Sequence, residues 1–297
     1  MIVRLADREF SGRFASLAEA RRHVAAHLDA PRVLPRPTSD WQEAGWAATA
    51  NLAATAYQTA LARRLDKTAI QYLSAATSQD VDGDGTNDVA GASSLTNLSQ
   101  AITNWAAAAN KLTVYLVGST TNGLFRLSGS ESLNVAQLDG WLDRFQSSNG
   151  NAIVVMDFDA AGSYLPLLAA PPGAERVVMA SAQAGKSSLR AAGGLISFSQ
   201  FFLSGLFNGK SLGAAFSDAR TAIKSASGLL GQTPQLDDNG NGIPDQKNVD
   251  GRVAAQRYLG PAFLTGNDPP SIGAVTPALQ VGAGWPGLAA TKRPHKL

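Results

Sequence analysis

Two aspartates stand at the end of a strongly apolar segment. Residues 152–156 are Ala-Ile-Val-Val-Met, and they lead into Asp157 and Asp159. Such a run, ended by polar and small residues, predicts a buried central strand with an exposed C-terminal end. α/β sheets place ligands and catalytic groups at strand ends of this kind. The two carboxylates, at positions i and i+2, could share a proton as acid and base or hold a metal, and Asp157 could equally accept a hydrogen bond from a backbone amide.

Cysteine is absent from the chain, and histidine occurs only at His23, His27 and His295. The body of the chain therefore holds no Cys/His dyad, no Ser/His/Asp triad and no zinc site built from the usual ligands. His23 and His27 have the i, i+4 spacing of a helical metal site, although two surface histidines on a terminal helix would have the same spacing.

Two acidic loops share one spacing. Residues 80–88 read DVDGDGTND and residues 237–245 read DDNGNGIPD. Oxygen side chains at alternate positions, followed by glycine, let a short loop wrap a hard cation and so favour calcium. Both loops lack the bidentate glutamate of a full calcium-binding hand, which weakens the affinity, and Asp, Asn and Gly also gather in metal-free turns. The candidate ligands are Asp80, Asp82, Asp84, Asp88, Asp237, Asn239, Asn241 and Asp245.

A third stretch, ASAQAGKS at residues 180–187, satisfies a relaxed phosphate-loop pattern. A phosphate loop needs a helix whose N-terminal amides hold the anion, yet two glycines follow within two turns, at Gly193 and Gly194. The candidate aspartate strand also precedes this loop instead of following it. A nucleotide-binding loop is therefore the weaker of the alternatives.

The composition bounds the class of protein. The chain has 297 residues, of which 44% are hydrophobic and 16% charged, and its formal charge is +2. No long run of one sign singles out nucleic acid or a membrane surface as a partner. Apolar stretches are interrupted within roughly 12 residues, short of the roughly 20 that span a bilayer. We expect a soluble chain without a transmembrane segment, and residues 1–30 lack the apolar middle of a secretory signal peptide; neither observation fixes the compartment.

Expected helices and strands alternate along the chain. Helical apolar spacing marks some segments and short continuous apolar runs mark others, while Asp40 with Glu43 and Asn134 with Gln137 have capping-box spacing. This alternation predicts an α/β fold, a three-layer α/β/α sandwich with a mainly parallel sheet. The expected helices are 16–30, 40–65, 95–109, 134–146, 197–207 and 211–226, and the expected strands are 69–73, 112–117, 152–158 and 176–181.

The order of several segments resembles bacterial caspase-like cysteine peptidases of the legumain type. The resemblance covers about residues 41–263. It implies a caspase-like domain there, after a helical and proline-rich segment at 1–40 and before a proline- and glycine-rich tail, or the start of a truncated further domain, at 264–297. The segments that carry it are TVYLVGSTTNGLFRLSGSESL, LDGWLDRFQ, AIVVMDFDAAGSYLPLL, RVVMASA, GGLISFSQFF and QTPQLDDNGNGIPD.

In that family one hydrophobic strand ends in His-Gly and the next ends in the nucleophilic Cys. The resemblance assigns Ser119 and Thr120 to the first pair of positions and Asp159 to the nucleophile position. A carboxylate is a poor nucleophile toward amides, and a serine hydroxyl cannot act as a base near neutral pH. Lys186 stands where relatives tend to have an acidic residue. Peptidase activity by the family mechanism should therefore be absent.

The leading hypothesis is an inactive peptidase homologue that acts as a binding or scaffold module. A peptide or protein segment would occupy a cleft formed by Ser119, Asp159 and the 182–190 loop, with Lys186 or Arg190 near enough to pair with Asp159. Thr120 and Asp157 would adjoin that cleft. The alternatives are a hydrolase of another class that uses Asp157 and Asp159, and the nucleotide binder. The family's opening strand would fall within residues 1–40, where only Arg-Val-Leu at 32–34 could supply it.

Overall fold

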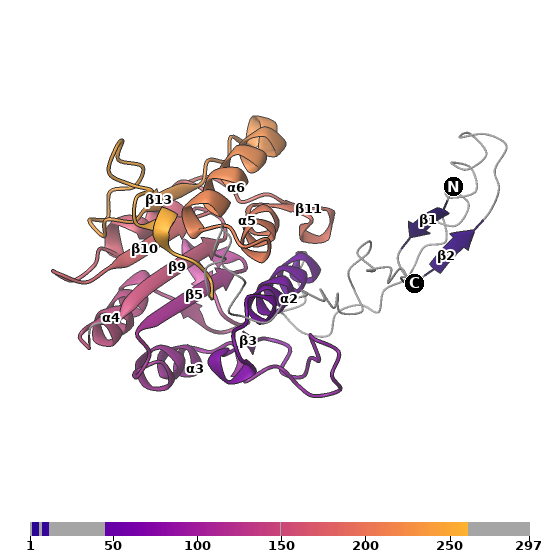
Figure 1. Cartoon of the computed structure of the whole chain (residues 1–297), viewed down its shortest axis with the longest axis horizontal. Coiled ribbons are helices and arrows are strands. Elements are labelled where there is room, and N and C mark those ends of the chain that lie inside the picture. Colours follow the sequence, from indigo (N-terminus) through magenta and orange to yellow (C-terminus); the bar gives the residue numbers. More distant parts are fainter. Residues whose placement is uncertain (1, 6–7, 12–44, 149, 261–297) are drawn as a thin grey trace, which may run out of the picture.

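Four strands form the central sheet, in the order β13-β10-β9-β5 (Figure 1). The computed structural model describes residues 2–5, 8–11, 45–148 and 150–260. Strands β5, β9 and β10 are parallel, and β13 pairs with β10 in the antiparallel sense. The bounds are Lys111–Val117 for β5, Asn151–Asp157 for β9, Arg176–Ala180 for β10 and Gln235–Asp237 for β13.

The central strand β9 is apolar on both of its faces. Ala152, Val154 and Met156 point into one core, whereas Ile153 and Val155 point into a second core on the opposite face of the sheet. Successive side chains of a strand alternate between the two faces, so a strand covered on both faces must be apolar throughout. The buried central strand expected from residues 152–158 is confirmed.

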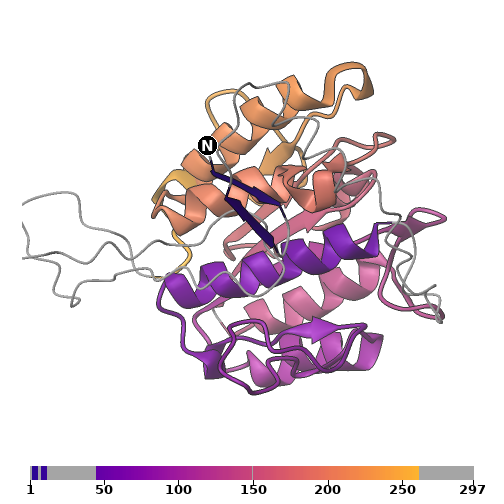
Figure 2. The ribbon, with the colours of Figure 1, turned by 90° about the vertical axis from the view of Figure 1, so that its right-hand side faces the viewer.

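Helices cover both faces of the sheet. Helices α3 and α4 pack on the core that contains Met156, and α5 and α6 pack on the opposite core. Helix α2 packs against α5, and Figure 2 shows α2 in front of the sheet, between these two helical layers. The expected α/β fold with a mainly parallel sheet is confirmed. The helices are α2 Trp46–Ala62, α3 Leu95–Gln100, α4 Val135–Gln146, α5 Phe198–Phe207 and α6 Leu212–Ser227.

Local signals set most helix starts. Asn134 and Gln137 form the predicted capping box at the start of α4. Ser94, Ser197 and Ser211 cap α3, α5 and α6 by accepting hydrogen bonds from backbone amides. Within the described part of the chain, no helix combines the length and the apolar character needed to cross a membrane.

The strand expected at 69–73 is mostly wrong. Asp66 accepts a hydrogen bond from the Thr68 amide and starts the 3-10 turn η2, so the chain becomes extended only after Ala69. The strand that follows, β3, has two residues and pairs with β4 away from the central sheet. The cap formed by Asp66 therefore favours a 3-10 turn where the apolar residues at 69–73 had predicted a strand. The short strands concerned are β3 Leu73–Ser74 and β4 Gly91–Ala92.

Several short elements were not expected from the sequence. The sequence did not predict β13, because three residues are too few to show the alternating pattern of a strand. In the loop after β13, the Asp245 amide donates to the Leu236 carbonyl at 2.8 Å. The other unexpected strands are β1 Ile2–Leu5, β2 Arg8–Ser11, β6 Thr120–Thr121, β7 Leu124–Arg126, β8 Ser132–Leu133, β11 Arg190–Ala191 and β12 Ile196–Ser197. The short helical segments are η2 Lys67–Ala69, η3 Ala101–Trp105, η4 Ala161–Leu167, η5 Ala192–Gly194, η6 Gly228–Leu230 and η7 Ala254–Gln256.

Several sequence expectations fall outside the described residues. They are the helix at 16–30 with His23 and His27, the capping pair Asp40 and Glu43, the strand at 32–34 and the tail from 264 onward. The second expected helix is present as α2, which begins at Trp46 after Gly45, a residue with a left-handed φ of 103°.

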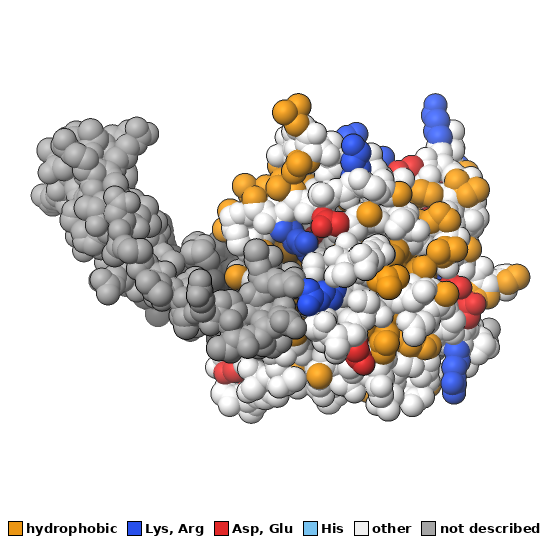
Figure 3. All heavy atoms as spheres, turned by 180° about the vertical axis from the view of Figure 1, so that it is seen from behind, with side chains coloured by type: hydrophobic (Ala, Val, Ile, Leu, Met, Phe, Trp, Pro, Cys, Tyr) orange, Lys and Arg blue, Asp and Glu red, His pale blue; other side chains and the backbone are white. Residues whose placement is uncertain are grey.

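Charged side chains are sparse on the face that Figure 3 shows. Figure 3 shows the face opposite to that of Figure 1, where Lys and Arg side chains are dispersed and acidic side chains lie among them. Small groups of hydrophobic atoms are exposed between them. Among the described residues visible on this face, the cationic side chains do not form a continuous patch of the kind that binds the nucleic acid backbone.

A buried arginine joins α4 to β10. Arg176 is fully buried, and its guanidinium donates to Gln146 Oε1 at 2.7 Å, to Asp139 Oδ1 at 2.7 Å and to Asp143 Oδ1 at 2.6 Å. Burial raises the pKa of Asp139, an effect that the hydrogen bond from Arg176 opposes. The Arg176 guanidinium is thus buried and hydrogen-bonded to three side chains. Removing one member of this cluster leaves a charged group without its partner, which lowers the stability of the fold.

We predict that Arg176→Met lowers the free energy of unfolding by about 3 kcal/mol, because it leaves two carboxylates without their cation. Urea denaturation followed by circular dichroism measures the change. Arg144→Met on the exposed side of α4 is the matched control and should change stability by less than about 0.5 kcal/mol. Equal effects of the two substitutions would contradict the prediction.

Candidate functional site

The candidate site lies at the carboxyl edge of the parallel strands. Val117 at the end of β5 is in register with Asp157 at the end of β9. Ser119 and Asp159 each follow two residues later, so they leave the sheet from neighbouring strands at the same edge. Ser119 is exposed and Asp159 is partly exposed. The structure thus brings the two sequence-predicted positions to one edge of the sheet.

Asp157 is fully buried and both of its carboxylate oxygens are engaged. The Ser188 hydroxyl donates to Oδ1 at 2.5 Å, and the Ser199 amide and hydroxyl donate to Oδ2 at 3.1 and 2.5 Å. Hydrogen bonds to a charged acceptor are among the strongest that side chains make. Asp157 therefore fastens the loop after β10 and the start of α5 to the end of β9, and it presents no free oxygen to a substrate.

Further polar groups surround this carboxylate. The Tyr115 hydroxyl donates to Ser199 Oγ at 2.7 Å, and burial, together with the charge of Asp157, raises the pKa of Tyr115. Gln232 donates from Nε2 to the Ser181 carbonyl at 2.7 Å and accepts the Leu189 amide at 2.8 Å. Sequence reasoning missed this network. The one available signal was Ser199, a buried serine in the first turn of a phenylalanine-rich helix.

The Asp159 side chain holds the same loop by accepting a hydrogen bond from a backbone amide of the loop. The Ser188 amide donates to Asp159 Oδ1 at 2.7 Å, so both aspartates converge on Ser188, one through its hydroxyl and the other through its amide. The next residue, Ala160, has a left-handed φ of 57° and donates its amide to the Lys186 carbonyl at 2.7 Å. The strand end and the 182–190 loop are thus one hydrogen-bonded unit.

The expected pairing of Lys186 or Arg190 with Asp159 is absent from the salt bridges of the described residues. Lys186 is exposed, and the Arg190 guanidinium instead donates to the Gly118 carbonyl, next to Ser119. Thr120 belongs to the small strand β6 and is partly exposed. Asp159 accepts the Ser188 amide, and Arg190 ties the loop to the end of β5.

The geometry does not favour either alternative chemistry. An acid and base pair needs both carboxylates within reach of substrate, whereas Asp157 is enclosed by serine donors. The loop at 180–187 is followed by coil and by β11, so no helix begins directly after it. The loop therefore lacks the following helix whose N-terminal amides hold the anion in a phosphate loop.

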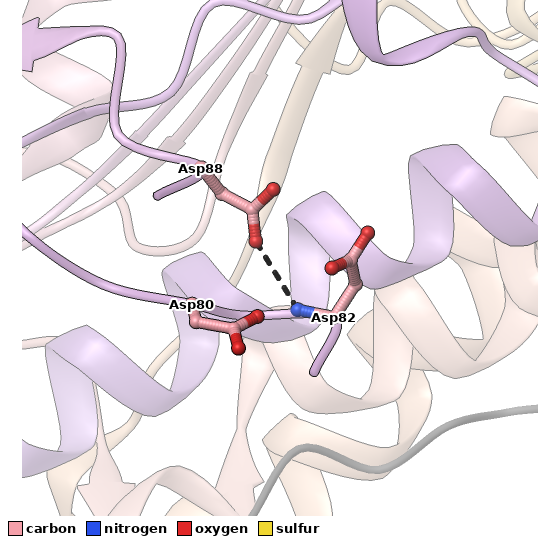
Figure 4. A group of neighbouring side chains, drawn as sticks. All are labelled: Asp80, Asp82 and Asp88. Carbon is pink, nitrogen blue, oxygen red and sulfur yellow. Dashed lines mark hydrogen bonds between the residues drawn. The ribbon is translucent and has the colours of Figure 1, made fainter. Parts of the chain in front are cut away.

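The first acidic loop gathers three carboxylates. Asp80, Asp82 and Asp88 each bring an oxygen within 4.8 Å of the others (Figure 4). Asp80 accepts the Gly83 and Gly85 amides at 2.7 and 2.9 Å, which curls the loop so that its oxygens face inward. Oxygen ligands at such spacing fit a calcium ion.

An ammonium group already lies among these carboxylates. Lys67 Nζ is 2.6 Å from Asp82 Oδ2, 2.6 Å from Asp84 Oδ2 and 3.1 Å from Asp88 Oδ1. Hydrogen bonds to these carboxylates, above all to Asp82, raise the pKa of Lys67, and the hydrogen bond from Lys67 lowers the pKa of Asp84. The fourth predicted ligand, Asp84, is thus turned toward Lys67.

The second acidic loop has the same turn but different surroundings. Asp237 accepts the Gly240 and Gly242 amides at 3.0 and 2.7 Å, as Asp80 does in the first loop, and burial raises the pKa of Asp237. Asp245, however, is paired with Arg220 on α6 at 2.6 Å. The amides of Asn239 and Asn241 both donate to Gln246 Oε1, at 2.8 and 2.7 Å. The predicted ligands of this loop are therefore engaged with protein groups.

The chain matches no protein-family model and no curated protein. Its assignment to a family is consequently a proposal that depends on the order of its segments and on the geometry of the carboxyl edge.

We predict that Asp157→Ala lowers the free energy of unfolding by about 3 kcal/mol, because it leaves the buried hydroxyls of Ser188 and Ser199 without their charged acceptor. Asp159→Ala, which loses one partly exposed hydrogen bond, should cost about 1 kcal/mol. Chemical denaturation of the two variants checks the order. An Asp159 effect equal to or larger than that of Asp157 would refute it.

Proposed function

We propose that the chain is a catalytically inactive homologue of the caspase-like, legumain-type cysteine peptidases, and that it binds a peptide or protein segment at the carboxyl edge of its sheet. One observation carries the proposal. Ser119 and Asp159, the two positions that the resemblance assigns to the general base and the nucleophile, follow neighbouring parallel strands at the same edge.

The residues at this edge lack the means for thiol chemistry. Peptide cleavage in the family needs a polarisable thiolate and an imidazole that shuttles its proton. The Ser119 hydroxyl remains protonated near neutral pH, and the Asp159 carboxylate is a poor nucleophile that also accepts the Ser188 amide. Cysteine is absent from the whole sequence, and histidine is absent between residues 28 and 294.

A binding role is supported by what the edge retains. The loop at 182–190 is fastened by Asp157, Asp159 and Arg190, so its exposed residues, including Lys186, are presented from a hydrogen-bonded frame. Ser119 and Thr120 border the same edge and offer hydroxyl groups. A pre-organised rim of polar groups binds a ligand at a lower entropic cost than a loose one. The proposed ligand is a peptide segment laid across this rim.

The experiment restores the missing groups. The double variant Ser119→His with Asp159→Cys should cleave at least one peptide in a panel with basic, acidic and asparagine residues before the scissile bond, and an electrophilic peptide probe should label it. The reason is that it would again place a thiol and an imidazole on adjacent strand ends. The unmodified chain and each single variant are the matched controls and should show neither cleavage nor labelling.

Two results would refute this function. Peptide turnover by the unmodified chain that Asp159→Ala abolishes would make the site active as it stands. A folded double variant that neither reacts with the probe nor cleaves any peptide would remove the geometric basis for the assignment.

We also propose that calcium binds the loop at 80–88 and displaces Lys67 from it. The convergence of Asp80, Asp82 and Asp88 supports this, and calcium would supply two positive charges where Lys67 supplies one. The ion would hold the loop in place and have no part in chemistry at the carboxyl edge.

We predict that Lys67→Met raises the calcium affinity of the chain several-fold, because the ion no longer competes with an ammonium group for the same carboxylates. Isothermal titration with calcium, and with magnesium for comparison, measures the affinity. Lys247→Met, an exposed lysine near the second loop, is the control and should leave it unchanged. Absence of calcium binding in both the unmodified chain and Lys67→Met would contradict the proposal.

A further inference from the structure

Asparagine is followed directly by glycine at five places in the sequence, and the structure describes both residues of four of these pairs. An asparagine in such a pair can lose its side-chain amide without an enzyme, when the backbone nitrogen of the glycine attacks the side-chain carbonyl carbon and closes a succinimide ring. Glycine permits this ring closure because it has no Cβ to obstruct it. The described pairs are Asn122-Gly123, Asn208-Gly209, Asn239-Gly240 and Asn241-Gly242.

The second acidic loop holds both of its Asn-Gly pairs by hydrogen bonds. The two glycine amides donate to the carboxylate of Asp237 at 3.0 and 2.7 Å, and the two asparagine side chains donate to Gln246 Oε1 at 2.8 and 2.7 Å. Ring closure requires the glycine nitrogen and the side-chain carbon to come together, so it must wait until these bonds open. Both pairs are therefore protected while the loop is folded.

The pair that follows α5 is held in a similar way. Asn208 donates from Nδ2 to the Ser204 carbonyl at 2.8 Å, and the Gly209 amide donates to the Leu206 carbonyl at 2.9 Å. The attacking nitrogen and the attacked side chain are thus both engaged with the last turn of the helix. Deamidation of this pair likewise requires local opening.

The fourth pair, Asn122-Gly123, forms the turn between β6 and β7. The φ angles of the two residues are 52° and 78°, both in the left-handed region, as in the two-residue hairpin turn that Asn-Gly favours. Both residues are exposed. Within the described part of the chain, neither the Asn122 side chain nor the Gly123 amide makes a hydrogen bond. This pair therefore has no bond to break at either reacting group.

We propose that Asn122 is a site of spontaneous deamidation. The Gly123 nitrogen forms a bond to Asn122 Cγ, the Cγ–Nδ2 bond breaks, and the proton of the glycine nitrogen leaves with the amide as ammonia. Water then opens the succinimide ring at one of its two carbonyl carbons. One opening gives aspartate, and the other gives isoaspartate, in which the main chain runs through Cγ. Each route consumes one water molecule and releases one ammonia molecule.

The two products affect the hairpin differently. Asp-Gly suits the same turn as Asn-Gly, so aspartate adds a negative charge and keeps Thr121 paired with Leu124. Isoaspartate adds one carbon atom to the main chain of a two-residue turn. Because the length of the turn fixes the register of a hairpin, this product disrupts the pairing of β6 with β7.

Strand β7 is anchored, so the change falls on β6. The Phe125 amide donates to the Tyr164 hydroxyl at 2.8 Å, and the Phe125 ring lies 4.9 Å from that of Phe158 between centroids. Thr120 and Thr121 are partly exposed and exposed, and they directly follow Ser119. Isoaspartate formation therefore releases residues that border the carboxyl edge of the sheet. The reaction itself needs neither a ligand nor an activity at that edge.

Tryptic mass spectrometry of the full chain, incubated in mildly alkaline buffer, tests the proposal. Trypsin cuts after Lys and Arg, so the fragments 112–126, 191–210 and 225–247 report separately on Asn122, on Asn208 and on the second acidic loop. In the folded chain, each asparagine of the last two fragments should convert about tenfold more slowly than Asn122, because hydrogen bonds must first open. A digest of chain that was not incubated is the blank.

The same incubation in urea is the matched control. Without folded contacts, the four asparagines should convert at rates within about threefold of one another, because each is followed by glycine. Labelling with an isoaspartyl methyltransferase should rise together with conversion of the fragment 112–126. Asn122→Asp, which has the charge of one product and a normal main chain, should carry no label before incubation. The amides of Thr121 and Leu124 should exchange hydrogen faster in the labelled chain than in Asn122→Asp.

Two results would overturn the proposal. Equal rates for the three fragments in the folded chain, or slower conversion of 112–126 than of the others, would remove Asn122 as the favoured site. Conversion of 112–126 without methyltransferase labelling would exclude the succinimide route. Equal hydrogen exchange in the labelled chain and in Asn122→Asp would refute the disruption of the hairpin. All of these outcomes are independent of the proposed loss of peptidase activity and of peptide binding.

Discussion

The buried carboxylate of Asp157 organises the carboxyl edge of the sheet. It receives the hydroxyls of Ser188 and Ser199 and thereby holds a loop and a helix that are far apart in the sequence against one strand end. A buried charge is stable only when its hydrogen bonds are complete, so the positions of both serines are fixed by the same requirement. The loop that carries Lys186 is held by a frame to which Asp157, Asp159 and Arg190 all contribute.

The regular parts of the fold could be predicted from the sequence, because their signals are local. The apolar run at 152–156 gives a strand buried on both faces, and the capping box of Asn134 and Gln137 starts α4 where expected. The strand β13 was not predicted, because a three-residue strand shows no alternating pattern. The strand predicted at 69–73 is mostly absent, because a 3-10 turn at Lys67–Ala69 takes the place of extended chain. Sequence pattern describes what a segment prefers alone, and the sheet decides which segments it accepts.

The candidate site was predictable to a lesser degree. Strand order brought Ser119 and Asp159 to one edge, yet nothing in the sequence tied both Asp157 and Asp159 to Ser188. The two acidic loops make the same point. Their spacing predicts the same turn, and both adopt it, but Lys67 enters one and Arg220 takes Asp245 from the other. Basic residues distant in sequence therefore decide which carboxylates of the loops remain available to a metal ion. The spacing of residues within a loop does not reveal such partners.

The loop that folds back on β13 has a consequence for how copies of this chain can meet. With the Asp245 amide bonded to the Leu236 carbonyl, that carbonyl is not available to a strand of another molecule. A backbone group at a sheet border that already has a partner is a poor template for pairing between molecules. The loop after β13 therefore shields part of this border from contact with a second copy.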